Sequence, residues 1–242
     1  MTKKNTIKEM SFLDHLEELR WRLLYSIIGI IAGAIISWIF IDFLIEQILL
    51  APAKSSAIPL QNLKPFGQLF LYFQVALIVG FIISIPNIFY QLWKFIAPAL
   101  KKNEQKYIKW IVLYSAFCFL SGIAFAYFLM LPVTLKFAAQ FGTELIENKI
   151  AISEYMSIVF SVLIASAIIF ELPMLSFFLS KLGILKPSLM RKFRRHSIIV
   201  IFIFAAILSP GTDPVAQVML GIPLVILYEI SILVSKLSQR KG

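Results

Sequence analysis

The sequence is poor in the residues that build metal centres, disulfides and soluble surfaces. Its 242 residues include one cysteine, Cys118, and two histidines, His15 and His196, that lie far apart in the chain. A single cysteine forms no intrachain disulfide, and distant histidines lack the spacing of a zinc or haem site. Only 15% of the residues are charged, against about 25% in soluble domains. The ten glycines form no phosphate-binding loop, so we predict no cofactor and no metal.

Apolar residues are abundant instead. They make up 60% of the chain, and the mean hydropathy is +0.86, values that fit a polytopic membrane protein. Six apolar runs predict membrane spans at residues 23–43, 70–96, 110–131, 156–179, 197–208 and 215–234. The last two are short, and the fifth covers roughly 20 Å against a hydrocarbon core of about 30 Å. We therefore predict an all-α membrane protein that forms a single domain over residues 1–242.

Lysine and arginine are distributed unevenly between the two sides of this topology. The N-terminus, the second-to-third loop, the fourth-to-fifth loop and the C-terminus hold 18 of them, and the other loops hold four. Positive charge favours the cytoplasmic side, so both termini are predicted to be cytoplasmic. The net charge of +10 then requires no nucleic-acid partner, because topology and anionic lipids account for it.

Glu171 and three prolines interrupt the apolar runs. Pro86, Pro173 and Pro223 predict kinked helices and a concave bundle. An ionised carboxylate inside the membrane costs at least about 2.5 kcal/mol, which favours a functional role for Glu171. One alternative is a proton-coupled secondary transporter that uses Glu171, although the chain shows no internal repeat and no second deep carboxylate. An intramembrane enzyme is disfavoured, since no serine–histidine, paired-aspartate or metal constellation falls within the spans.

The stretch at residues 11–22, SFLDHLEELRWR, predicts an amphipathic helix at the membrane interface. Phe12, Leu16 and Leu19 share one face at helical spacing, and several carboxylates lie on the other. Ser11 is a plausible helix start. The charge distribution places this helix in the cytoplasm.

Short segments in register along nearly the whole chain carry a resemblance to a known family. They are FLDHLEELRWRLL, PNIFYQLWKFIAPAL followed by KKNE, GIAFAYFLMLP, FELP, and the pair LSPGTDPVAQ and IPLVILYEISI. Together they resemble the TatC family, the multispanning receptor subunit of the twin-arginine protein translocase. The resemblance implies a Sec-independent translocase component that binds paired-arginine signal peptides of folded proteins. It also implies TatA- and TatB-type single-span partners, further TatC copies and export driven by the proton gradient.

The same resemblance assigns roles to individual residues. The family's signal-binding carboxylates correspond to Glu18 and Glu104. Its N-terminal arginine corresponds to Arg20, for which we favour a role in holding the helix or its carboxylates. The family's intramembrane glutamate, which influences partner contact, corresponds to Glu171.

Three further residues fall in matching segments near the last span. Gln217, Tyr228 and Asp213 are candidates for partner contacts, although Asp213 is equally explained as the N-cap of that span. The implied location is the plasma (inner) membrane of a bacterium, with a thylakoid membrane as the alternative for an organelle-encoded chain.

Overall fold

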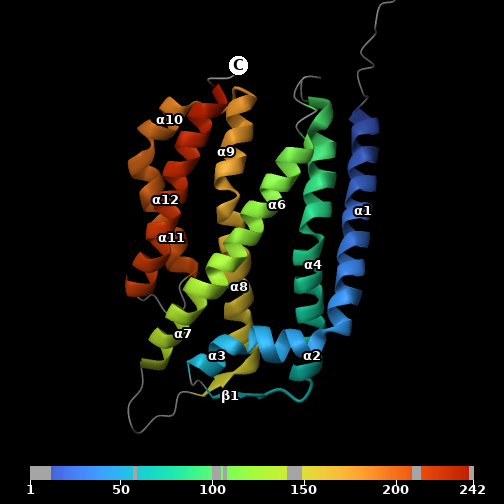
Figure 1. Cartoon of the computed structure of the whole chain (residues 1–242), viewed down its shortest axis with the longest axis vertical. Helices are drawn as coiled ribbons and strands as arrows, with labels where there is room; N and C mark the ends of the chain where they lie inside the picture. Colours follow the sequence, from blue (N-terminus) through green and yellow to red (C-terminus); the bar gives the residue numbers. More distant parts are fainter. Residues whose placement is uncertain are drawn as a thin grey trace, which may run out of the picture.

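Long helices that run between two ends of the molecule make up most of the structure (Figure 1). The computed structural model describes residues 12–56, 59–99, 105, 108–140, 149–208 and 214–239. Within these residues, five helical segments are long and apolar enough to cross a membrane: Leu13–Ile39, Gly67–Ile96, Ile108–Lys136, Ile152–Lys181 and Gly221–Ser238. The predicted all-α membrane fold is therefore confirmed. The predicted fifth span falls on α11 (Arg194–Leu208), whose 15 residues extend about 22 Å, so six spans stay a prediction.

The N-terminal segment and the first span form one uninterrupted helix, α1 (Phe12–Ile39). Residues 12–22 of the predicted amphipathic helix are helical and continue without a break into the first span, and their location at the membrane interface stays a prediction. α1 packs along α4 (Gly67–Ile96), which ends in a 3₁₀ turn, η2 (Ala97–Ala99). Their backbones approach closely at Gly33 and Gly80, where a Cβ built on Gly33 would lie 2.5 Å from the Gly80 carbonyl oxygen. Such small-residue contacts are typical of membrane helices.

A helical arm crosses the end of the molecule that lies opposite the start of α1 (Figure 1). It consists of α2 (Ile41–Phe43), the π-helix η1 (Leu44–Leu49) and α3 (Ala51–Ser55). Two tyrosines hold the arm, since Tyr127 Oη donates to the Ile48 carbonyl at 2.8 Å and Tyr155 Oη to the Leu49 carbonyl at 2.6 Å. The two-residue strands β1 (Leu60–Gln61) and β2 (Ile150–Ala151) pair in parallel at the same end.

The third helical path continues beyond its predicted end. It comprises α6 (Ile108–Phe125), the π-helix η3 (Ala126–Met130) and α7 (Leu131–Gln140), and so passes through Pro132. The Leu131 N–H donates to the Ala126 carbonyl five residues earlier, which is the π-helical pattern, and α7 continues through Pro132 in its first turn. α6 crosses α8 (Ile152–Phe170) at Gly122, where a Cβ would lie 2.7 Å from Ala167 Cα.

Glu171 separates α8 from α9 (Leu172–Lys181). Its N–H donates to the Ile168 carbonyl at 3.1 Å, a tighter turn than the α-helical pattern. Pro173 follows at the start of α9, where a missing N–H is tolerated. Of the three prolines predicted to kink spans, this one lies at an interruption, whereas α4 continues through Pro86 and α12 through Pro223.

The C-terminal helices pack beside α9 (Figure 1). They are α10 (Pro187–Lys192), α11 and α12 (Pro214–Gln239). The extensive α9–α12 contact includes small polar side chains: the hydroxyls of Ser180 and Ser235 hydrogen-bond to each other, and Ser238 donates to the Phe177 carbonyl at 3.3 Å. The end of α12 and the start of α1 lie at the same end of the molecule, on opposite sides of it (Figure 1).

Candidate functional site

A partly buried ion pair lies near the start of α1. Glu18 and Arg22 are four residues apart, which places them on the same face of the helix. Arg22 Nη2 donates to Glu18 Oε1 at 2.8 Å, and both side chains are 18% exposed. Glu18 Oε2 and Arg22 Nε are buried and have no hydrogen-bond partner within the described chain. The pair therefore uses one bond where a carboxylate and a guanidinium can form two.

A polar chain on α4 continues from this ion pair. Arg22 Nη1 donates to Gln91 Oε1 at 3.3 Å, and Gln91 Nε2 donates to Asn87 Oδ1 at 3.4 Å. Asn87 Nδ2 then donates to the Tyr25 carbonyl of α1 at 3.1 Å. The network returns to the helix from which it starts and fixes the register of α1 on α4 at this end of the molecule.

The other signal-binding candidates are placed differently. Arg20 is exposed, and no hydrogen bond or ion pair of its side chain occurs within the described residues. The Glu18 carboxylate pairs with Arg22 and not with Arg20, and the roles predicted for Arg20 stay predictions. Glu104 lies outside the described residues. His15 of α1 stacks on Phe95 of α4 with ring centroids 4.3 Å apart, which adds an aromatic contact beside Glu18.

The Glu171 carboxyl group lies against α6. It neighbours Ser115 and the backbone of Phe119, and its Oε1 is buried without a hydrogen-bond partner in the described part of the chain. The Glu171 carbonyl accepts the Leu175 N–H at 2.8 Å, which fixes the backbone of Glu171 at the start of α9. Within the described residues, no group of three or more histidine, cysteine, aspartate or glutamate side chains could hold a metal ion.

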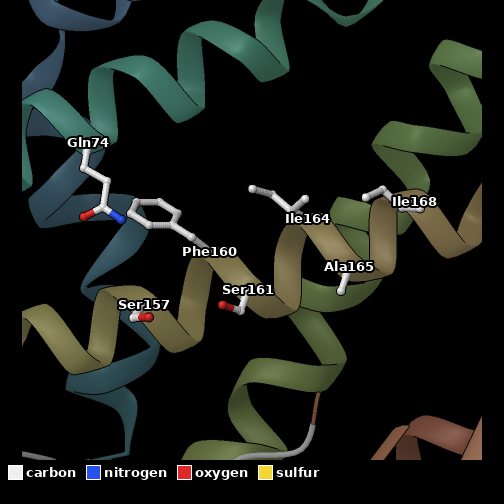
Figure 2. Close-up of a pocket in the computed structure, with 7 residues that line it drawn as sticks. All are labelled: Gln74, Ser157, Phe160, Ser161, Ile164, Ala165 and Ile168. Atoms are coloured by element: carbon white, nitrogen blue, oxygen red, sulfur yellow. The ribbon is translucent and has the colours of Figure 1, made fainter. Parts of the chain in front are cut away.

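A hollow of about 380 Å³ lies between α4 and α8. Figure 2 shows Gln74 of α4 extending toward Phe160 of α8, with Ser157 and Ser161 one helical turn apart beneath it. These polar side chains lie on segments that are apolar enough to span a membrane. They give this face of the molecule hydrogen-bonding capacity inside the bilayer.

A second hollow, of about 510 Å³, lies between α8, α9, α11 and α12 and is mainly apolar. Tyr228 lines it and donates its hydroxyl to the Met190 carbonyl at 2.9 Å. Gln217 Nε2 donates to the Phe202 carbonyl at 2.9 Å, and Arg194 pairs with Glu229. Tyr228 and Gln217 thus join α12 to α10 and α11. Asp213 lies outside the described residues.

Comparison with known proteins identifies the family. The family model described as "Sec-independent protein translocase protein (TatC)" matches residues 14–223. The chain belongs to the TatC family. The TatC protein of Carboxydothermus hydrogenoformans is 35% identical over 234 residues, which cover 97% of this chain and 96% of the relative. That of Aquifex aeolicus is 39% identical over 236 residues, with 96% and 97% covered.

Solved TatC structures share the fold. A crystal structure described as "Twin Arginine Translocase Receptor- TatC" matches with a TM-score of 0.79 at 38% identity. The match covers 93% of this chain and 99% of the chain in that structure. The same receptor solved in DDM matches with a TM-score of 0.80 at 38% identity. The resemblance drawn from the sequence is confirmed. As a TatC protein, the chain is a membrane-embedded component of Sec-independent protein transport.

The sequence missed Arg22, Gln91 and Asn87. The four-residue spacing of Glu18 and Arg22 is typical of an ion pair on one face of a helix. Arg20 was considered instead, because Arg20 corresponds to the arginine of the family motif. Gln91 and Asn87 gave no signal, because their role depends on how α4 packs on α1.

Proposed function

We propose that this TatC protein is the receptor that binds paired-arginine signal peptides, and that Glu18 is one of the carboxylates that bind them. The observation that supports this most directly is the Glu18 Oε2 atom, which is buried and accepts no hydrogen bond from the described residues. A carboxylate oxygen without a donor in a partly buried site favours a charged donor group. A guanidinium suits it, because five N–H groups in a planar fork can reach both oxygens.

The second carboxylate of the proposed site is Glu104. Each arginine of the signal would then meet its own carboxylate, with Arg20 at the edge of the site. Lysine offers a compact point charge in place of a fork, so a two-lysine signal gains fewer geometrically defined hydrogen bonds. Partial exclusion of water strengthens each bond and increases the difference between the two signals.

Single-span TatA- and TatB-type subunits and further TatC copies are the proposed partners. The proposed contacts involve Glu171, together with Gln217, Tyr228 and Asp213 near the last span. Polar groups inside the membrane favour helix association, because they find hydrogen-bond partners on another helix more readily than in lipid. Glu171 Oε1 is such a group, since it has no partner within the described chain.

The proposed setting is a bacterial plasma membrane with both termini in the cytoplasm, or a thylakoid membrane if the chain is organelle-encoded. The uneven distribution of lysine and arginine supports this orientation, as does the location of both described ends at one end of the molecule. The Glu18 site then faces the compartment from which folded cargo arrives, and the proton gradient drives export.

Site-specific crosslinking tests this function. A photo-crosslinking amino acid at Leu16, which is 46% exposed, reports a signal peptide near Glu18 in membranes. We expect a twin-arginine peptide to crosslink and a two-lysine peptide to crosslink much less. Glu18→Gln should lower the twin-arginine crosslink by about tenfold, the contribution of one charge-assisted hydrogen bond.

Glu17→Gln is the matched control, because Glu17 precedes Glu18 and is exposed. It makes the same change in charge and should preserve the crosslink. Equal crosslinking of the two peptides, or equal losses in the two variants, would refute Glu18 as a signal-binding residue.

A further inference from the structure

We propose that Arg22 occupies the arginine site of the ligand-free protein, so that a signal arginine binds Glu18 only after displacing an arginine of the receptor itself. This inference rests on the proposed function of Glu18. It adds an internal competitor to the site, and it concerns a residue that lies two positions beyond Arg20.

The geometry of the ion pair is that of a replaceable contact. Arg22 makes one bond to Glu18, at 2.8 Å, and a longer one to Gln91, at 3.3 Å. Glu18 Oε2 and Arg22 Nε are both left buried without partners. A buried polar atom without a hydrogen bond is costly. An incoming guanidinium that reaches both Glu18 oxygens removes one of these unsatisfied atoms.

Charge also requires Arg22 to move. The positive charge of Arg22 balances the negative charge of Glu18, so the closed pair presents no net charge to a second arginine. Two guanidinium groups that share one carboxylate repel each other at short range. Release of Arg22 restores the negative charge to which the signal is attracted.

Gln91 provides a place for the released side chain. Its Oε1 already accepts a hydrogen bond from Arg22, and Asn87 and the Tyr25 carbonyl continue the polar chain along the α1–α4 contact. Arg22 can therefore rotate away from Glu18 while it keeps one hydrogen bond. The displaced guanidinium stays in a polar site and is not forced into lipid.

Internal competition sets an affinity threshold. If only a fraction of the receptor has Glu18 open, the apparent Kd of every ligand is increased by the reciprocal of that fraction. The factor is the same for arginine and lysine signals, so it leaves their ratio unchanged. The apparent Kd of the weaker lysine signal then exceeds the concentration at which signals are present, so this signal is not bound. This is a form of selection against the wrong ligand.

Arg22→Gln separates competition from simple positioning of Glu18. The Kd values of a labelled twin-arginine peptide and a two-lysine peptide are measured by fluorescence anisotropy on the full chain in lipid nanodiscs. With Arg22 as competitor, we expect both peptides to bind about tenfold more tightly, since one charge-assisted hydrogen bond no longer opposes them. Arg22→Lys should give a smaller gain, and the two-lysine signal should become exportable in cells that carry Arg22→Gln.

Lys94→Gln is the control for net charge, because Lys94 is exposed in the last turn of α4, close to the same end. It should change both Kd values little. The proposal fails if Arg22→Gln weakens binding while Arg22→Lys restores it, which would make Arg22 a positioning residue. It also fails if Lys94→Gln tightens binding as much as Arg22→Gln does.

Failure of the underlying function gives a different result. If Glu18→Gln leaves the preference for the twin-arginine peptide intact, Glu18 is not part of the site, whatever Arg22 does. If Glu18→Gln removes the preference and Arg22→Gln produces no gain, only the competition is refuted. Arg22→Lys keeps the charge and most of the length of the side chain, so it remains informative should Arg22→Gln fold poorly.

Discussion

Glu171 is a carboxyl group held inside the membrane at the break between α8 and α9. Its Oε1 is buried and unpaired within the described residues, and its neighbours on α6 are Ser115 and the backbone of Phe119. It belongs to a different helix pair from Glu18. We therefore predict that Glu171→Gln leaves signal-peptide binding intact and weakens partner assembly or transport, as measured by co-purification of the single-span subunits and by export of a reporter.

Glu154→Gln is the matched control for this prediction, because Glu154 is exposed in the first turn of α8. It removes the same charge from the same helical path and should preserve both assembly and export. Loss of signal binding in Glu171→Gln would instead place the signal site inside the membrane. Unchanged assembly and export would leave Glu171 with a structural role alone.

The site shows how far single residues could be read from the sequence. Glu18 and Glu171 were identified because the family pattern marks them, and the structure gives each an unsatisfied carboxylate oxygen. Their functional roles stay proposals, as do those of Glu104 and Asp213. The ion pair of Glu18 with Arg22 was not predicted, because motif matching marks family positions and does not weigh the helical spacing that brings these two side chains together. The contribution of Gln91 arises only when two helices meet.

The α1–α4 contact is the element-level feature on which the Glu18 network depends. α1 touches few other elements, and most of its apolar side chains are exposed. Gly33 meets Gly80 so closely that any added side chain forces the helices apart. We predict that Gly33→Leu destabilises the protein by about 1–3 kcal/mol or more, through overpacking, and lowers the Tm in detergent.

Ala32→Leu tests whether this effect is specific to the contact. Ala32 is the preceding residue and is exposed, so its larger side chain should be accepted with little change in Tm. Equal Tm values for the two variants would show that the helices do not pack at this point.

The bounds of the helices were predicted well where the apolar runs are long. They were predicted poorly where local backbone geometry determines whether a helix ends or continues. The runs 70–96 and 156–179 correspond closely to α4 and to the α8–α9 path. The sequence ended the third span before Pro132, but the π-helix η3 accommodates the proline. The first span was predicted to end at residue 43, but helical structure continues to Ser55 because Ile41, Ile45 and Leu49 are buried against the bundle.

The molecule as a whole is asymmetric between its two ends. One end carries the start of α1, the Glu18 network, the basic helix α10 and the end of α12, and the other carries the helical arm and the strand pair (Figure 1). The short α11 lies on one side and extends about 22 Å, less than the roughly 30 Å of hydrocarbon. The bilayer is expected to thin beside α11, or other helices to cover it.

This asymmetry predicts which positions are accessible from each side of the membrane. Cys118 is the single cysteine, so Cys118→Ser gives a background in which one introduced cysteine reports alone. Lys64 lies next to β1 and Ser188 lies in α10, so the two positions are at opposite ends of the molecule (Figure 1). Both side chains are exposed, and each is replaced by cysteine in turn. With the basic end in the cytoplasm, a membrane-impermeant maleimide added to intact spheroplasts should label Lys64→Cys. It should label Ser188→Cys only after permeabilisation, because the charge distribution retains lysine- and arginine-rich segments inside.

The reverse pattern would invert the orientation and place the Glu18 site on the side that cargo reaches only after transport. Labelling of both positions from outside would mean an even number of crossings between them. It would contradict the three helical paths, α4, α6–α7 and α8–α9, that lie between the two positions and require them on opposite sides.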